Sequence, residues 1–256
     1  IADSDILLWA KGYALGLNLN VNIEEPDVYP LAIQGPKSEE LLISIFGEEI
    51  KKIKFFNFRV LDFEGTKQII ARSGYSKQDG FEIYFKTHEK HFDNVEIGEK
   101  LWDTIWEAGK KFNILPGCPN LIERIEGGLF SYGNEMTRAN NPLEIGLEKY
   151  CTLDGSIDFI GREKLQRIAK NGINQQIKGV LFDGDPCPIC AIPWPVTVGE
   201  QKVGAITSAI WSPRLKSNIG LSMVDRNFWH QGQQVVVHLP KGIISNGKIV
   251  DTPFKG

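Results

Sequence analysis

The strongest constraint in this sequence is a change of pattern near residue 175. From Gln176 onward the chain is a series of short β-type segments separated by turns rich in Gly, Pro and Asn. The segments cover residues 178–182, 195–198, 203–210, 218–224 and 235–239. Short strands at this spacing, each bounded by turn residues, predict a small antiparallel barrel or sandwich in this part of the chain.

Before this point the chain alternates between helical and extended patterns. An apolar stripe at helical spacing predicts a first helix through Gly16, capped by Asp3 or Ser4. The other predicted elements are strands over 28–34 and 80–86, a hairpin within 56–72, and helices over 36–46, 97–112 and 161–170. We therefore expect an α+β fold: mixed α/β domains over 1–172, followed by a small C-terminal antiparallel β-barrel domain over 173–256.

A further helix is predicted after the Pro-rich stretch 116–119, with Asn120 as its N-cap and apolar residues through Leu129. Gly127 and Gly128 fall inside this pattern, where each glycine costs about 1 kcal/mol relative to alanine. Two interpretations remain open. Either another backbone or a ligand approaches closely at the glycines, or the helix ends before them.

Composition excludes several classes of protein. The 256 residues are 42% apolar and 24% charged, with 29 Lys and Arg against 32 Asp and Glu. Without a basic excess, nucleic acid is not expected as a partner. No apolar run reaches the 18 or so residues of a membrane span, so we expect a soluble protein that does not enter a membrane. Four cysteines without a leading signal segment favour a reducing cytoplasm over a disulfide framework.

The sequence begins at Ile1 without a methionine and runs directly into the first predicted helix. We therefore expect an N-terminally truncated chain, so that a preceding segment would complete the first domain.

Motifs for metals and nucleotides are incomplete. Cys187 and Cys190 have the spacing of a metal or redox pair, but no second pair follows to complete four ligands. His88 and His91 lie in a charged loop. The glycine-rich patterns that bind dinucleotides or nucleotides and the serine hydrolase motif are also missing from the sequence. We therefore predict no bound metal.

A carboxylate on the strand over 80–86 is the best candidate for a binding group. Strand alternation places Phe81 and Ile83 on one face, and Glu82 with Tyr84 on the other. A carboxylate beside an aromatic ring can accept paired N–H donors from a planar heterocycle such as a pterin. The alternative is that Glu82 is only the solvated side of a half-buried strand.

Four separated stretches together resemble the folate-dependent aminomethyltransferase family, which includes the T-protein of the glycine cleavage system. They are residues 31–36 (LAIQGP), 71–83 (ARSGYSKQDGFEI), 124–136 completed by 158–163 (DFIGRE), and 204–215 with its SPRL end. The resemblance implies a T-protein-like folate-binding region over 1–172 and tetrahydrofolate as a cosubstrate. It places the pterin-binding glutamate at Glu82. Arg124 in the third stretch is a further candidate for binding folate, with a surface or helix-lining cation as its alternative role, and Tyr84 beside Glu82 is the other candidate.

Departures from the T-protein pattern point to one branch of this family. Pro119 and Asn120 stand where that enzyme usually has an arginine. Four stretches resemble the branch that demethylates dimethylsulfoniopropionate (DMSP) in marine bacteria, namely residues 1–5, 71–84, 116–134 and 183–186. The implied reaction transfers a methyl group from the DMSP sulfonium to N5 of tetrahydrofolate. Asp5 and Tyr84 are the catalytic candidates, and Trp9 is a second aromatic candidate for holding the cation, with core packing as its alternative role.

Rival functions stay open at this stage. An aminomethyltransferase of the same fold would act on a lipoyl-bound donor and need a carrier-protein partner. A non-catalytic folate-binding regulator is the other alternative, although its iron–sulfur-associated relatives carry a Lys-Gly-Cys-Tyr-x-Gly-Gln motif where this chain has 131–134 SYGN. The expected partners of this chain are a small sulfonium substrate and folate, and a homodimer is left open.

Overall fold

The computed structural model describes residues 4–26, 28–86, 95–118 and 120–255. The chain divides into two compact units, Ile1–Cys118 and Pro119–Gly256. Each unit is described by itself below. None of the described helices is both long and apolar enough to cross a membrane.

The first unit is built on an antiparallel sheet. Its elements are α1 (Ser4–Gly16), β1 (Val28–Gln34), α2 (Ser38–Phe46), β2 (Phe58–Phe63), β3 (Thr66–Ala71), β4 (Gly80–Lys86) and α3 (Val95–Gly109), with short 3-10 turns over Glu48–Lys52 and Lys110–Phe112. The sheet has four strands in the order β1-β4-β3-β2, and every pair is antiparallel. The predicted hairpin is confirmed, and its turn residues Glu64 and Gly65 both have positive φ, as a tight turn of this hand requires.

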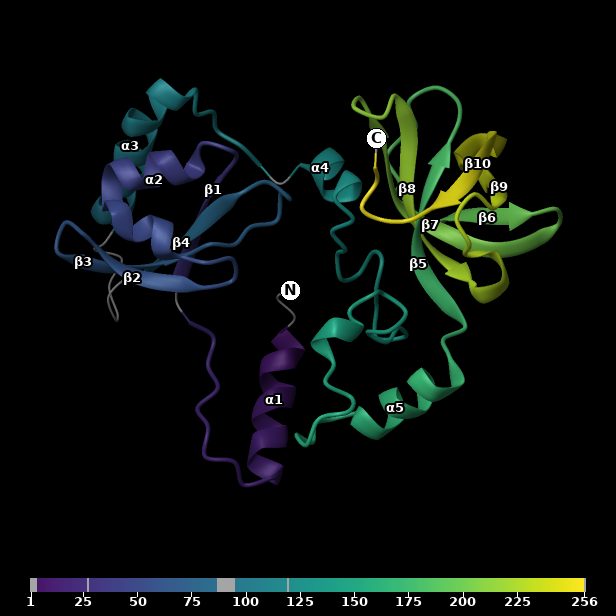
Figure 1. Cartoon of the computed structure of the whole chain (residues 1–256), viewed down its shortest axis with the longest axis horizontal. Coiled ribbons are helices and arrows are strands. Elements are labelled where there is room, and N and C mark those ends of the chain that lie inside the picture. Colours follow the sequence, from purple (N-terminus) through teal and green to yellow (C-terminus); the bar gives the residue numbers. More distant parts are fainter. Residues whose placement is uncertain (1–3, 27, 87–94, 119, 256) are drawn as a thin grey trace. The chain divides into compact units, whose positions relative to one another are not determined.

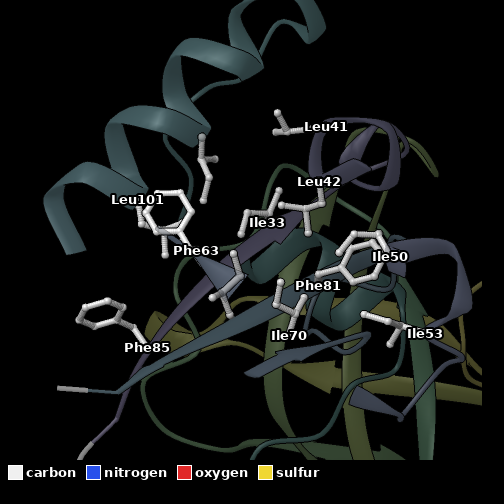
Figure 2. Close-up of a cluster of buried hydrophobic side chains, with 12 residues drawn as sticks. Ile33, Leu41, Leu42, Ile50, Ile53, Phe63, Ile70, Phe81, Phe85 and Leu101 are labelled. Atoms are coloured by element: carbon white, nitrogen blue, oxygen red, sulfur yellow. The ribbon is translucent and has the colours of Figure 1, made fainter. Parts of the chain in front are cut away.

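Helices cover one face of this sheet. Figure 1 shows α2 and α3 on the same side of it, where Leu42 from α2 and Leu101 from α3 pack with Ile70 and Phe81 from the strands. In Figure 2 these side chains point toward one another, together with Ile50 after α2. Fully buried side chains of this size each contribute about 1.5–3 kcal/mol, so the cluster holds the helices to the sheet. The opposite face of the sheet carries the candidate site.

The second unit contains the predicted barrel. Its elements are α4 (Leu121–Glu126), α5 (Arg162–Asn171), β5 (Gln175–Phe182), β6 (Trp194–Val198), β7 (Gln201–Ser212), β8 (Ser217–Asp225), β9 (Gln234–His238) and β10 (Ile244–Val250), with 3-10 turns over Glu148–Tyr150, Arg226–Phe228 and Pro240–Gly242. The six strands close in the order β10-β5-β8-β7-β6-β9, and every neighbouring pair is antiparallel. The α+β fold with a C-terminal antiparallel barrel is confirmed, and closure leaves no free sheet edge.

The sequence-based prediction missed β10. Asn and Gly are residue types typical of turns, but Asn246 and Gly247 lie inside β10, with Gly247 opposite Phe182 and Val235. A Cβ at Gly247 would lie 2.7 Å from the carbonyl oxygen of Leu181. The glycine is therefore required by the close approach of β5 in the barrel wall, a tertiary requirement that local sequence does not reveal.

Helix α4 resolves the two interpretations of the glycine pair. The side chain of Asn120 accepts a 2.9 Å hydrogen bond from the backbone N–H of Ile122, which confirms the predicted N-cap. The helix ends at Glu126, so Leu129 lies beyond it and the longer helix was wrong. Close approach also occurs, because a Cβ at Gly128 would lie 3.0 Å from the Cβ of Thr252.

A buried amide in the first unit generates a stability prediction. The side chain of Gln68 is on the covered face of the sheet, and its Oε1 is buried without a hydrogen-bond partner in the described chain. Leaving such an oxygen unpaired costs about 1–3 kcal/mol. Gln68→Met should therefore raise the free energy of unfolding by about 1 kcal/mol in urea denaturation, although the bond to Thr66 is lost. The exposed Gln201→Met is the control and should change nothing, and an equally large gain there would contradict the argument.

Candidate functional site

The candidate site lies on the sheet face that α2 and α3 leave open. Strand pairing aligns two cross-strand rows on this face, because directly opposite residues of antiparallel strands point the same way. One row is Phe58, Ala71, Glu82 and Ala32, and the next is Val60, Ile69, Tyr84 and Pro30. Phe81 and Ile83 are fully buried on the other side, as the alternation predicted. The result is an apolar platform with one carboxylate near its centre.

Two hydroxyl groups hold the carboxylate of Glu82. Ser73 donates to its Oε2, and the Tyr84 hydroxyl donates to the same oxygen at 3.2 Å. Among the described residues none donates to Oε1. Glu82 and Tyr84, which the sequence paired by alternation alone, are therefore in direct contact, and one oxygen of the carboxylate is left for a ligand.

Tyr84 is held as a neutral phenol. Partial burial raises its pKa above the usual value of 10.0, and the neighbouring charge of Glu82 adds to the increase. Because the phenol keeps its proton at neutral pH, it acts as a hydrogen-bond donor to Glu82 and not as a source of protons. Its side chain lies on the open side of the sheet beside the carboxylate.

The loop between β3 and β4 supplies Ser73, and Gln34 at the end of β1 holds that loop. The Gln34 amide nitrogen donates to the carbonyl oxygens of Ser73 at 3.1 Å and Phe81 at 3.2 Å. Its oxygen accepts a 2.7 Å bond from Ser76. The loop bends around this amide at Gly74, where any side chain would overlap it. These three hydrogen bonds, together called the Gln34 latch, connect the end of β1 to both ends of the loop between β3 and β4.

Arg72 anchors the first residue of the same loop. Its guanidinium binds both carboxylate oxygens of Asp79 at the other end of the loop and also donates to Glu39 of α2 at 2.7 Å. It lies 5.3 Å from the ring centre of Phe81, within cation–π range. The Arg72 hydrogen bond lowers the pKa of Asp79, so the pair is intact at neutral pH and is lost as pH falls through that lowered pKa.

The structure places Arg124 in the second unit, inside a polar cluster. Its guanidinium donates to Glu135 at 2.8 Å, to the hydroxyl of Ser208 at 2.6 Å and to the carbonyl of Leu129 at 3.0 Å. The ion pair is buried, with side-chain exposures of 9% for Arg124 and 0% for Glu135. Removing one partner of such a pair leaves an uncompensated buried charge. The bond from Arg124 to Ser208 of β7 connects α4 to the barrel. A folate contact at Arg124 stays a prediction.

The other predicted residues lie elsewhere. Asp5 is in α1, but its side chain is outside the described part of the structure, so its catalytic role stays a prediction. Trp9 is exposed on α1 and stacks on Tyr13 with ring centres 5.9 Å apart, so it is not a core residue in this arrangement. His88 and His91 lie outside the described residues.

Cys187 and Cys190 pack beside the barrel core as free thiols. Burial raises the pKa of each thiol to about 11, which leaves them protonated and unreactive at neutral pH. Within the described residues no group of three His, Cys, Asp or Glu could hold a metal ion.

Sequence reasoning missed Ser73 and Gln34 as members of the site. Both lie in stretches that the family resemblance had marked, residues 71–83 and 31–36, but nothing in the local pattern indicates what their side chains contact. Their partners are 9 and 39 residues away in the chain, so only the folded sheet brings them together.

Family models match nearly the whole chain. Residues 2–155 match the GCVT N-terminal domain, and residues 176–255 match the glycine cleavage T-protein C-terminal barrel domain. The chain therefore belongs to the glycine cleavage T-protein family.

Individual relatives narrow the comparison. The chain is 42% identical over 243 residues to the dimethylsulfoniopropionate demethylase DmdA of Ruegeria pomeroyi, covering 95% of this chain and 64% of that protein. It is 32% identical over 251 residues to an aminomethyltransferase of Bacillus cytotoxicus, covering 96% and 65%. The crystal structure of the glycine cleavage system aminomethyltransferase T of Bartonella henselae has the same fold, with a TM-score of 0.76 at 18% identity over 98% of this chain and 66% of that one. The chain thus spans slightly less than two thirds of the length of these relatives.

The Gln34 latch generates a prediction for the site loop. In Gly74→Ala the added methyl group would overlap the Gln34 amide, which must move and give up its bonds to Ser73, Ser76 and Phe81. We expect a loss of about 1–3 kcal/mol in the free energy of unfolding, measured by denaturant titration. Gly117→Ala is the control, because a Cβ there meets no atom within 4 Å. Equal stability of the two variants would contradict the latch.

Proposed function

We propose that this chain is part of a tetrahydrofolate-dependent methyltransferase that removes a methyl group from DMSP. The products are 3-methylthiopropionate and 5-methyltetrahydrofolate: the sulfur–methyl bond breaks, a bond from N5 to the methyl carbon forms, and N5 loses its proton. The observation that carries the proposal is the 42% identity to the DMSP demethylase, against 32% to the Bacillus cytotoxicus aminomethyltransferase over a similar length.

The open face of the sheet fits a pterin ring. Glu82 offers an oxygen that no described residue binds, and carboxylate oxygens accept the N–H donors of such a ring well. Ala32 and Ala71 flank Glu82 in its cross-strand row, and their small side chains leave room for a flat ring. Phe58, 63% exposed at the end of the same row, adds an aromatic surface. We therefore assign the pterin to this platform.

The donor group determines what chemistry the protein must supply. A sulfonium leaves as a neutral thioether and needs no proton, whereas an amine donor must be protonated first. Tyr84, with its raised pKa, is unsuited to deliver a proton but suited to hold a cation against its ring, which is worth about 0.5–2 kcal/mol. Holding the reacting groups in line then contributes several kcal/mol by removing the entropy cost of their encounter.

Two further assignments rest on the family resemblance. Asp5 is proposed to orient folate N5 or the sulfonium, and Arg124 is proposed as a folate contact. Since the Nη atoms of Arg124 already donate to Glu135, Ser208 and Leu129, we expect its substitution to affect stability as well as binding.

The domain boundary, the localisation and the partners of the protein are also proposed. The boundary at 172/173 falls between the two stretches that match the family domains. We propose a cytoplasmic protein whose partners are the sulfonium substrate and folate.

An aminomethyltransferase is the second candidate. Several other relatives carry that name, including one of Caldanaerobacter subterraneus at 36% identity over 81% of this chain. Such an enzyme would take its donor from a lipoyl-carrying protein, so the two candidates differ in the donor that they accept.

Glu82→Ala should weaken tetrahydrofolate binding about 100-fold or more, because it removes charge-assisted hydrogen bonds to the pterin. Isothermal calorimetry on the natural full-length protein measures this affinity, and the melting temperature reports whether the fold is intact. The matched control is Glu107→Ala, which removes an exposed carboxylate on α3 that pairs with Lys110. Unchanged folate affinity in Glu82→Ala would exclude the pterin assignment.

Tyr84→Ala should lower the turnover of DMSP, measured as methyltetrahydrofolate formed, by at least tenfold, because the ring that holds the cation is lost. Tyr84→Phe keeps the ring and should retain more activity. Cys187→Ala and Cys190→Ala are the controls and should turn over normally. If the wild-type protein forms methylenetetrahydrofolate from an aminomethyl-lipoyl carrier and nothing from DMSP, the aminomethyltransferase is the correct candidate.

A further inference from the structure

We infer that Ser73 is a positioning residue, whose hydroxyl fixes the carboxylate of Glu82 so that Oε1 is presented to the pterin on the open face of the sheet. This inference rests on the proposed function and deepens it, because it gives a role to Ser73, which the motif over 71–83 contains but does not single out. The inference is argued from the contacts of Ser73 and Tyr84 with Glu82, and from Gln34 and Arg72, which hold the loop that contains Ser73.

The first step concerns the distribution of donors. Ser73 and Tyr84 both donate to Oε2 of Glu82, and no described residue donates to Oε1. A carboxylate oxygen has two lone-pair sites, so Oε2 is saturated by the protein. A ligand with N–H donors therefore finds its free acceptor at Oε1. A carboxylate without these bonds would rotate freely, and fixing it would cost binding free energy.

The second step concerns the two donors, which are not equally rigid. The Tyr84 hydroxyl lies at the end of a long side chain and is 3.2 Å from Oε2. Ser73 has a short side chain, and its backbone carbonyl accepts from Gln34 at 3.1 Å. Because the position of the Ser73 hydroxyl follows from its backbone, Ser73 is the donor that determines the orientation of the carboxylate.

The third step explains why the backbone at Ser73 stays in place. Ser73 follows Arg72, which is clamped to Asp79 and Glu39, and precedes Gly74, around which the loop bends over the Gln34 amide. The loop is thus held from both sides. These contacts within the first unit hold the Ser73 hydroxyl against Oε2 of Glu82. The carboxylate is therefore oriented before a planar ligand binds.

Substitutions at Ser73 test the inference through folate affinity. On the natural full-length protein, the dissociation constant of tetrahydrofolate is measured by isothermal calorimetry for wild type, Ser73→Ala, Ser73→Cys and Ser73→Thr. We expect Ser73→Ala to bind about tenfold more weakly, since one charge-assisted hydrogen bond is lost. Ser73→Thr keeps the hydroxyl and should restore binding to within about threefold. Ser73→Cys, a weak donor of similar shape, should fall between them.

Controls separate this inference from the proposed function. Ser44→Ala removes a hydroxyl that bonds the backbone of α2 and should leave folate affinity unchanged. Melting temperatures report whether any variant is unfolded. If wild type binds tetrahydrofolate and Glu82→Ala does not, but Ser73→Ala binds as wild type, the positioning role is wrong while the proposed function stands. A weakened Ser73→Ala that Ser73→Thr fails to restore also overturns it. If wild type itself does not bind tetrahydrofolate, the proposed function fails and this inference with it.

Discussion

The alternation of side chains along β4 is the constraint on which the site depends. Phe81 and Ile83 are fully buried under α2 and α3, so the residues between and after them must face the opposite side. A shift of register by one residue would exchange the two sets and bury Glu82 in an apolar core. The hydrophobic free energy that holds the helices to the sheet therefore also holds Glu82 and Tyr84 on the open face. Stability and the placement of the candidate site share one cause.

Polar contacts of the loop between β3 and β4 determine the orientation of the Glu82 carboxylate. The strand determines which face Glu82 points to, but the orientation of its carboxylate depends on the loop between β3 and β4. That loop is held by Gln34 from β1 and by the Arg72 contacts with Asp79 and Glu39. The side chains of Gln34 and Arg72 are partly buried, where a hydrogen bond is costly to leave unmade. The same pairing that stabilises the loop makes its geometry reproducible.

The second unit uses buried polar groups differently. Arg124 and Glu135 form an ion pair that is almost fully buried, and Ser208 completes it from β7, next to a register shift in the strand pairing. The cost of desolvating both charges offsets much of their attraction, so such a pair is weak evidence for stability. Either charge alone is costly to bury, so the pair favours the arrangement in which the two groups meet. We interpret this cluster as the connection between α4 and the barrel. Its residues belong to stretches that define the family, so a family motif here marks architecture at least as clearly as it marks a binding site.

Local sequence determined the elements whose signals are local. Strand alternation in 80–86, the Asn120 cap and the turn at Glu64 and Gly65 were readable because each depends on neighbouring residues, and the series of short strands predicted the barrel. Tertiary structure alone decided that Gly247 belongs to a strand, that α4 ends before its glycines, and that Ser73 and Gln34 meet at Glu82. These features depend on pairing between residues distant in the chain, and a pattern of neighbours contains no information about which distant atoms folding brings within hydrogen-bond distance.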